Sequence, residues 1–321
     1  MERRTALQAL AAAGLASMGA ARASEAQPLN LLVGFAAGSV PDLVARVISR
    51  PLTQALGRTT IVENKGGAGG QLALAALKQH SAVAQQLAIT PVAALSLYPL
   101  TYARLPYDPE RDFVPVCSIC VIDFALVVAA DHPAQTLQEF VAWCKRNPGK
   151  ASIGNPGSGS SPHFVATLFG TVAGIQVEHV PYRAPPQIAQ EVIGGTLSAG
   201  MASVPLFSEL IKSGRLRVLA TSGAQRNPFY PHIPTFSEVG YPGVVGQEWF
   251  ALYAPAGASP DLVAALGRAV LQAVGRDDVK AALTPLGLSL DVRDAVWLAE
   301  RRREESAQWR AVVQRTGFKA Q

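Results

Sequence analysis

The sequence is poor in aromatic and charged residues. Aromatic side chains make up 7% of the 321 residues and charged side chains 16%, whereas hydrophobic residues reach 49%. This apolar composition argues against intrinsic disorder, and the length is sufficient for one large or two ordinary domains. The net charge of +5 comes without a stripe of basic and aromatic residues, so we expect no nucleic-acid partner.

Long hydrophobic runs are also absent, because no uninterrupted apolar run reaches the ~18 residues of a membrane-spanning helix. The N-terminus, "MERRTALQALAAAGLASMGAARA", combines a charged start, a mildly apolar stretch and an Ala-x-Ala site at its end. This pattern predicts a signal peptide over residues 1–23, cleaved near Ala23. The Arg3-Arg4 pair leaves both the general and the twin-arginine export routes open. We therefore expect an exported, periplasmic protein.

The sequence has only three cysteines, Cys117, Cys120 and Cys144. Cys117 and Cys120 match the C-x-x-C spacing, but they lie in "VPVCSICVIDFALVVAA", which has the composition of a strand. Residues three apart on a strand point to opposite faces, so these two thiols are not expected to meet. We interpret them as small buried apolar side chains. No group of His, Cys, Asp and Glu has metal-binding spacing, so we expect neither a metal ion nor a cofactor.

Short apolar strands alternate with helical patterns, which predicts an α/β fold with a largely parallel sheet. The expected strands cover Leu29–Phe35, Thr59–Glu63 and Gln86–Thr90, and the expected helices cover Asp42–Leu56, Thr136–Asn147, Pro260–Val274 and Ala295–Thr316. Two proline-rich segments, "LYPLTYARLPYDPERDFVPV" and "QRNPFYPHIPTFSEVGYPG", interrupt this pattern. We interpret them as crossings between two lobes, with hinges near Ala103–Tyr107 and Ala220–Ser222. The expected lobes are 24–104 plus 223–321 and 105–222.

Two loops that precede predicted helices are candidate anion sites. In "GFAAGSVPD", Ser39 and Asp42 have the spacing of a capping box, in which Asp42 reaches back to the amide of Ser39. The free amides of the helix start and the helix dipole favour an anion, although for this stretch alone an ordinary capped helix without a ligand is the favoured interpretation. "NPGSGSSPHF" repeats the arrangement in the second predicted lobe. Two such helix starts facing one cleft would suit a ligand with two anionic or polar ends.

Several other features have both a functional and a purely structural interpretation. Ser160 and His163 could belong to a hydrolase, but no G-x-S-x-G motif surrounds the serines, and we expect no catalysis. Arg183 could hold a carboxylate by two hydrogen bonds or form a surface ion pair. The glycines of "GGAGG", 66–70, fit a phosphate nest or, more simply, a tight turn. The charges of "RRREE", 301–305, are typical of a solvated, self-paired helix face.

The sequence resembles the periplasmic solute-binding proteins of the tripartite tricarboxylate transporter type, also called Bug receptors. The resemblance is carried in order by the segments "GFAAGSVPDLVARVISRPLTQALGRTTIVENKGGAGGQLA", "LPYDPERDFVPV", "GNPGSGSSPHF", "HVPYR" and "PHIPTFSEVGYPG". It implies a two-lobed, type II-like periplasmic binding protein fold whose lobes, joined by two crossing strands, close on a small organic anion. The implied partners are that carboxylate and the membrane subunits of a transporter, and the expected state is a monomer. A sensor that presents its ligand to a membrane receptor kinase, or less plausibly an exported hydrolase, would be the alternatives.

The two loops and the resemblance together give a set of candidate ligand-binding residues. Pro91–Leu95 and Met201–Ala202 are apolar where relatives often place polar groups, so we expect a ligand with an apolar or aromatic portion beside its carboxylate rather than citrate. The candidates are Phe35, Ala36, Ala37, Gly38, Ser39, Asp42, Thr90, Pro91, Val92, Asn155, Gly157, Ser158, Gly159, Ser160, His163, Arg183, Met201 and Ala202.

Overall fold

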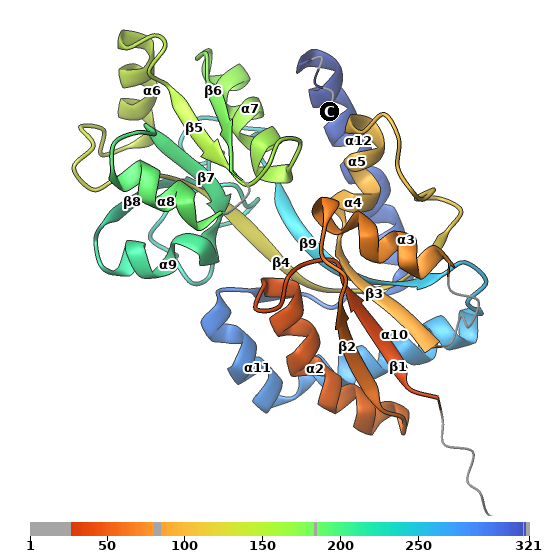
Figure 1. Ribbon diagram of the computed structural model, residues 1–321. Helices are drawn as coiled ribbons and strands as arrows, with labels where there is room; N and C mark the ends of the chain where they lie inside the picture. The colour runs from red at the N-terminus through yellow and green to blue at the C-terminus, as the bar shows by residue number, and fades with distance from the viewer. Residues whose placement is uncertain (1–26, 80–84, 183–184, 317, 319–321) are drawn as a thin grey trace, which may run out of the picture.

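The structure is a computed structural model that describes residues 27–79, 85–182, 185–316 and 318 (Figure 1). The predicted signal peptide, residues 1–23, lies outside the described residues. Within the described part of the chain, no helix combines the length and the apolar character needed to cross a membrane.

Strands and helices alternate along most of the chain, as expected. The strands are β1 (Leu29–Val33), β2 (Thr60–Asn64), β3 (Gln86–Pro91), β4 (Phe113–Ala129), β5 (Ser152–Asn155), β6 (Glu178–Pro181), β7 (Ala199–Ser203), β8 (Leu216–Thr221), β9 (Gln247–Pro255) and β10 (Ser289–Leu290). The helices are α2 (Val40–Leu56), α3 (Gln71–Gln79), α4 (Ala93–Ser96), α5 (Tyr98–Thr101), α6 (Leu137–Arg146), α7 (Ser161–Ala173), α8 (Pro186–Ile193), α9 (Val204–Lys212), α10 (Pro260–Gly275), α11 (Asp277–Leu283) and α12 (Ala295–Thr316), with short 3-10 helices η2 (Ala68–Gly70) and η4 (Thr284–Leu286). Each predicted strand and helix lies within two residues of its expected bounds.

The strands form one continuous mixed sheet in the order β2-β1-β3-β9-β4-β7-β5-β6. The outer strands pair in parallel: β1 with β2 and β3, and β5 with β6 and β7. The central pairs that involve β4 and β9 are antiparallel. The expectation of a largely parallel sheet is therefore wrong for the centre. The reason lies in the path of the chain between two halves of the molecule: the first half contains β1, β2 and β3, and the second contains β5, β6, β7 and β8. Strand β4 leads from the first half to the second and β9 returns to the first, so β4 and β9 run in opposite directions.

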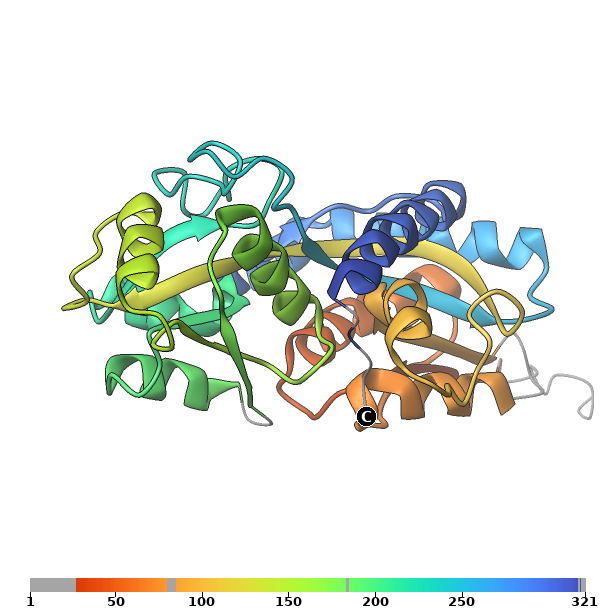
Figure 2. The same cartoon turned by 90° about the horizontal axis from the view of Figure 1, so that it is seen from above.

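The 17-residue strand β4 passes through both halves of the molecule (Figure 2). Its residues 113–123 pair with β9, and its residues 124–129 pair with β7 and β8. The chain therefore passes between the halves at Asp123–Phe124 and again at Gly246–Gln247. Ser222 joins the two passages, because its Oγ accepts from the amide of Phe124 at 2.9 Å and donates to the carbonyl of Gly246.

The first passage differs from the predicted hinge near Ala103–Tyr107. The proline-rich segment there forms α5 and a loop packed on the first half before β4 begins. The second proline-rich segment, 225–243, is expected in the first lobe, 24–104 plus 223–321, but it stays with the second half, where Tyr230 and Ile233 share an apolar core with Phe207 of α9. Ser222, at the end of the second predicted hinge, does lie at a passage.

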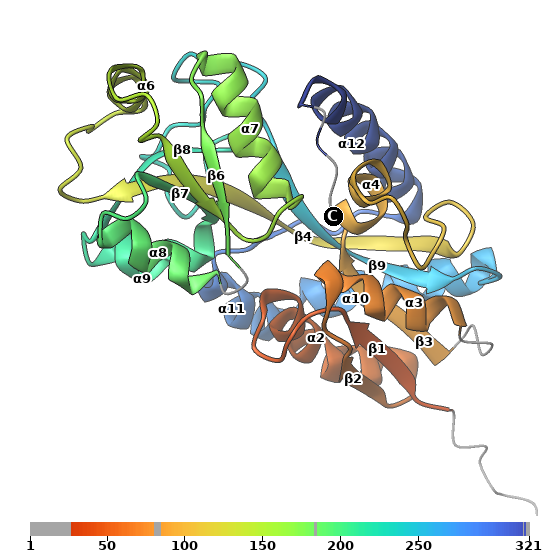
Figure 3. The ribbon, with the colours of Figure 1, turned by 45° about the horizontal axis from the view of Figure 1, so that its top comes forward.

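The two faces of the sheet are covered differently. On one face a single apolar core extends across both halves and joins residues of α3, α4, α6, α7 and α12. On the other face there are two separate cores: α2, α10 and α11 cover the first half, and α8 and α9 cover the second. Figure 3 shows these two groups of helices with their respective halves. The halves are thus joined along one face and divided on the other.

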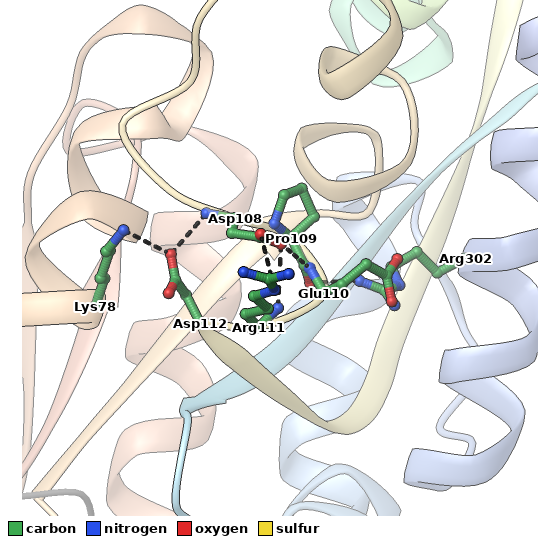
Figure 4. Close-up of polar contacts among 7 residues, drawn as sticks. All are labelled: Lys78, Asp108, Pro109, Glu110, Arg111, Asp112 and Arg302. Carbon is green, nitrogen blue, oxygen red and sulfur yellow. Dashed lines mark hydrogen bonds and ion pairs between the residues drawn. The ribbon is translucent and has the colours of Figure 1, made fainter.

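The motif "LPYDPERDF" anchors the start of β4 (Figure 4). Asp112 accepts from the amide of Asp108 at 2.6 Å and pairs with Lys78 of α3 at 2.9 Å. Arg302 of α12 binds the carbonyl of Pro109 and pairs with Glu110 at 2.6 Å. The motif therefore ties α3 and α12 to the sheet, which is a structural role.

Cys117 and Cys120 are buried and unpaired, as is Cys144. The expected placement on opposite faces of β4 is wrong, because the strand bulges between Pro115 and Cys117 and again between Ser118 and Cys120. Both thiols consequently pack into the same apolar core. Burial raises the pKa of each to about 12, so both remain protonated and unreactive at neutral pH.

Close backbone packing explains the glycines of residues 66–70. A Cβ on Gly34, at the end of β1, would lie 2.6 Å from the Cα of Gly70. Gly69 and Gly70 also have φ of 65° and 97°, in the region that favours glycine. The tight-turn interpretation accounts for this loop.

Gly34→Ala should destabilise the protein, because the clash is with backbone that cannot yield without moving β1. We expect a loss of about 1–3 kcal/mol, measured as a lower melting temperature. The matched control is Gly275→Ala at the end of α10, where a Cβ would meet nothing within 4 Å. This control should be neutral or stabilising by about 0.4–1 kcal/mol. Equal melting temperatures for the two variants would contradict the close approach.

Candidate functional site

A cavity of about 740 Å³ lies between the two halves, on the face where the cores are divided. Its walls come from the start of α2 and the start of α7, from β4 and β9 at the passages, and from α9 and η4. A cavity of this size suits a small organic ligand. The lining residues of the first half are Phe35, Gly38, Ser39, Val40, Leu43, Gly69, Pro91, Tyr98, Ile122, Glu248, Phe250, Pro285 and Leu286; those of the second are Phe124, Pro156, Ser160, Ser161, Pro162, Pro185, Pro186, Ala202, Ser203, Pro205, Leu206, Ser208 and Glu209.

The first predicted loop is held in place by Asp42 rather than by a capping box. Asp42 is buried and accepts from the amide of Gly38 at 2.8 Å, not from that of Ser39. It also accepts from Arg46 at 2.9 Å and from Asn64 at 2.8 Å. Burial alone would raise the pKa of Asp42, but these hydrogen bonds outweigh it and lower the pKa below its ordinary value.

The carboxylate of Asp42 accepts from the amide of Gly38, and the side chain of Ser39 makes no capping hydrogen bond. Its Oγ is buried without a protein partner in the described structure, although Ser39 lines the cavity. Such an unsatisfied hydroxyl is costly unless something else binds it. Ser39 and the start of α2 therefore line the cavity, and the hydroxyl of Ser39 has no protein partner there.

The second predicted loop is a conventional helix start. The Oγ of Ser160 caps α7 by accepting from the amide of His163 at 3.4 Å, and it donates to the carbonyl of Gly157 at 2.9 Å. The Nδ1 of His163 accepts from the amide of Gly159 at 2.9 Å. Burial and the neighbouring His179 lower the pKa of His163 to about 4. His163 is thus neutral and supports the loop from behind.

Some of the predicted ligand-binding residues line the cavity and others do not. The lining ones are Phe35, Gly38, Ser39, Pro91, Ser160 and Ala202. Ala36, Ala37, Thr90, Val92, Asn155, Gly157, Ser158, Gly159 and His163 are not among the lining residues, and neither is Asp42. Met201 is fully buried in the core shared by the two halves. Arg183 lies outside the described residues.

Glu248 is the most informative lining residue that the sequence analysis missed. It is the second residue of β9, and its Oε2 accepts from the hydroxyl of Ser161 in α7 at 2.9 Å. Burial and repulsion from Glu305 raise the pKa of Glu248 to about 8, in spite of that hydrogen bond. The only signal in the sequence is an acidic residue inside the apolar strand "QEWFALYAP".

Glu305 of α12 is buried, although the sequence predicted a solvated helix face for residues 301–305. It is 4% exposed, accepts from the hydroxyl of Ser96 at 3.2 Å and pairs with Arg301 at 3.3 Å. Burial raises the pKa of Glu305 to about 7 against the effect of Arg301. The pairing of Arg301 with Glu304 and Glu305 is confirmed, and Arg303 and Glu304 are exposed as expected. Glu305, by contrast, is buried where α12 packs against α4.

The basic side chains of the described chain lie elsewhere. Among the described residues that line the cavity, none is Lys, Arg or His. Nor does any group of His, Cys, Asp and Glu in the described part have the arrangement of a metal site. The polar groups available there are hydroxyls, backbone amides at two helix starts, and the carboxyl groups of half-buried Glu248 and exposed Glu209.

Comparisons with known proteins agree with this geometry. The model of the family described as "Tripartite tricarboxylate transporter family receptor" matches residues 44–318. The protein BugT of Bordetella pertussis is 30% identical over 97% of this chain and 95% of its own. Two solved structures from Rhodopseudomonas palustris are similar: Rpa4515 with adipate (25% identity, TM-score 0.82, covering 92% of this chain and 99% of its own) and MatC with bound malate (26%, 0.78, 89% and 99%).

Two α/β halves joined by crossing strands, with a cavity between them, define the class of two-lobed solute-binding proteins. The chain belongs to the tripartite tricarboxylate transporter receptor family, which includes the Bug proteins. This family is one of substrate-binding receptors.

Asp42→Ala should destabilise the protein by about 1–3 kcal/mol near pH 7, since it leaves the amide of Gly38 and the side chain of Asn64 without their partner. The pKa of Asp42 is lowered by folding. Its stabilisation is therefore present above the ordinary carboxyl pKa and is lost as the pH falls through the folded value.

Melting temperatures at about pH 7, 5 and 3 would test this, because the gap between wild type and variant should narrow toward acid. Asp131→Ala, at an exposed aspartate, is the control and should change little. A gap that stays constant down to the lowest pH would show that the carboxylate charge of Asp42 does not contribute.

Proposed function

We propose that the protein is a periplasmic solute-binding protein that captures a small organic carboxylate for a membrane transporter of the tripartite tricarboxylate type. The observation that carries this proposal is the cavity between the halves, into which the starts of α2 and α7 open from opposite sides. Amides at helix starts favour anions, and the unpartnered hydroxyl of Ser39 adds a donor. The malate and adipate named for two relatives are carboxylates, which supports the same ligand class.

Capture would proceed by hinge closure at the two passages. The halves share one core on one face and have separate cores on the cavity face, so bending there requires little repacking. The ligand can draw the halves together only to the extent that it binds the closed form better than the open one. Residues 1–23 would be removed on export, and Arg183 stays a candidate contact for the ligand's carboxylate.

The walls favour a ligand that is only partly polar. Phe35, Leu43, Phe250 and Leu206 give the cavity apolar surface on both sides. We therefore propose a carboxylate with an apolar or aromatic portion. A tricarboxylate such as citrate would leave two further charges without cations among the described lining residues, at a considerable cost in desolvation.

A thermal-shift panel of citrate, malate, adipate, benzoate and phenylacetate tests the ligand class. A carboxylate with an apolar portion should raise the melting temperature by several degrees at saturation, since a ligand at 100 times its Kd adds about 2.7 kcal/mol. Citrate should produce no shift. Stabilisation by citrate together with no response to the aromatic and aliphatic acids would contradict the proposal.

A pair of variants on α9 locates the site. Ser208→Trp places a large side chain in the cavity and should abolish the thermal shift, whereas Lys212→Trp on the same helix, outside the lining, should retain it. Equal shifts for the two variants would mean that the ligand binds elsewhere.

A further inference from the structure

A carboxyl group stands in the cavity that we propose to bind a carboxylate. Glu248 lines this cavity, and its hydrogen bond to Ser161 places it beside the first residue of α7. A ligand carboxylate at the start of α7 would therefore meet a second carboxyl group. Neither the capping of α7, which Ser160 performs, nor the packing of the halves requires an acid at this position.

The groups that face Glu248 come from four helices. Ser161 of α7 donates to it, and so does the backbone amide of Ala93 in α4. The hydroxyl of Tyr98 approaches from α5, and the carboxyl group of Glu305 approaches from α12. The nearby cation of α12, Arg301, pairs with Glu304 and Glu305 instead. In the described structure, Glu248 takes part in no ion pair, and its only facing ionisable groups are acidic.

An ionised Glu248 and a ligand carboxylate in the same cavity would repel each other, and both would be partly desolvated. A single proton removes this conflict, because a carboxylic acid donates a short, strong O–H···O⁻ hydrogen bond to a carboxylate. We propose that Glu248 binds the ligand as a neutral carboxylic acid and donates its proton to an oxygen of the ligand's carboxylate. This inference rests on the proposed function.

The proposal makes ligand capture proton-linked at alkaline pH. Burial and Glu305 raise the pKa of Glu248 to about 8, far above that of an exposed glutamate. Below that pH the free protein already carries the proton, so binding takes up none and the Kd is flat. Above it, each binding event takes one proton from solvent, and the affinity falls by up to about tenfold per pH unit.

Isothermal titration calorimetry tests this on the mature chain, with adipate, malate and phenylacetate as probes at pH values from about 6.5 to 9.5. Wild type should bind with constant Kd below about pH 8 and weaken above it. Glu248→Gln, which keeps a donor and the volume of the side chain, should bind with a Kd that is independent of pH. Glu178→Gln, at an exposed glutamate of strand β6 outside the cavity lining, is the matched control and should behave as wild type.

Of two further measurements, the first needs no variant and the second needs no ligand. Titrations of wild type near pH 9 in buffers of different ionisation enthalpy count the protons taken up, and the expected number approaches one. The infrared carbonyl absorption of neutral carboxylic acids near pH 7 without ligand should be weaker in Glu248→Gln than in wild type by the contribution of one group, while that of Glu305 remains.

The possible failures are distinguishable. If none of the probes binds at any pH, the proposed function fails. Binding by wild type that is independent of pH to 9.5, or an ionised Glu248 near pH 7, overturns only the present inference. An affinity that rises with pH and is lost in Glu248→Gln would also overturn it, because Glu248 would then be accepting from a hydroxyl or ammonium group of the ligand.

Discussion

The structure depends on the hydrogen bonding of β4 along its whole length. A strand of 17 residues is long for a globular protein, and it has to satisfy its backbone groups in two different surroundings. It does so by pairing with β9 in one half and with β7 and β8 in the other. The change of partners falls at Asp123–Phe124, where the buried Asp123 accepts from Asn227 and Gln247. The same residues that complete the sheet thus define the passage between the halves.

This arrangement explains why the cavity lies on one face only. A core that extends across both halves keeps α7 and α12 together, and Phe164 and Trp309 are in ring contact there. On the opposite face, α2 and α9 belong to separate cores and are free of each other's packing. The proposed hinge closure would bend the sheet at Asp123, so that the divided face opens and closes while the continuous face changes little. The loops before α2 and α7 line the same cavity as Ile122 and Phe124, which flank the bend.

Much of this could be predicted from the sequence, and the exceptions have physical reasons. Local signals are strong for α12, whose bounds agree with the prediction, and for the helix start at Ser160. Bulges, by contrast, are set by the pairing of β4 with β9. The regular alternation of side chains along a strand therefore placed Cys117 and Cys120 wrongly on opposite faces. Glu305 sits in a charged run that is typical of an exposed face, and only the packing of α12 on α4 buries it. The carboxylate of Asp42 binds the amide of Gly38 and not the expected amide of Ser39, because its hydrogen bonds with Asn64 and Arg46 orient it toward Gly38.

Glu248 shows most clearly what a sequence leaves undetermined. The neighbouring residues in the sequence give no sign that it differs from an ordinary polar residue at the end of a strand. Its chemistry comes from Ser161, Tyr98 and Glu305, which lie on three different helices and reach it only in the folded protein. Glu305 accepts a hydrogen bond from Ser96 and pairs with Arg301. The positive charge of Arg301 therefore compensates Glu305 and not Glu248. The acid nearer the cavity is left without a cation, and a proton is the simplest way to remove its charge. Two acids and one arginine are therefore enough to place a neutral hydrogen-bond donor in a cavity whose other donors are backbone amides and hydroxyls.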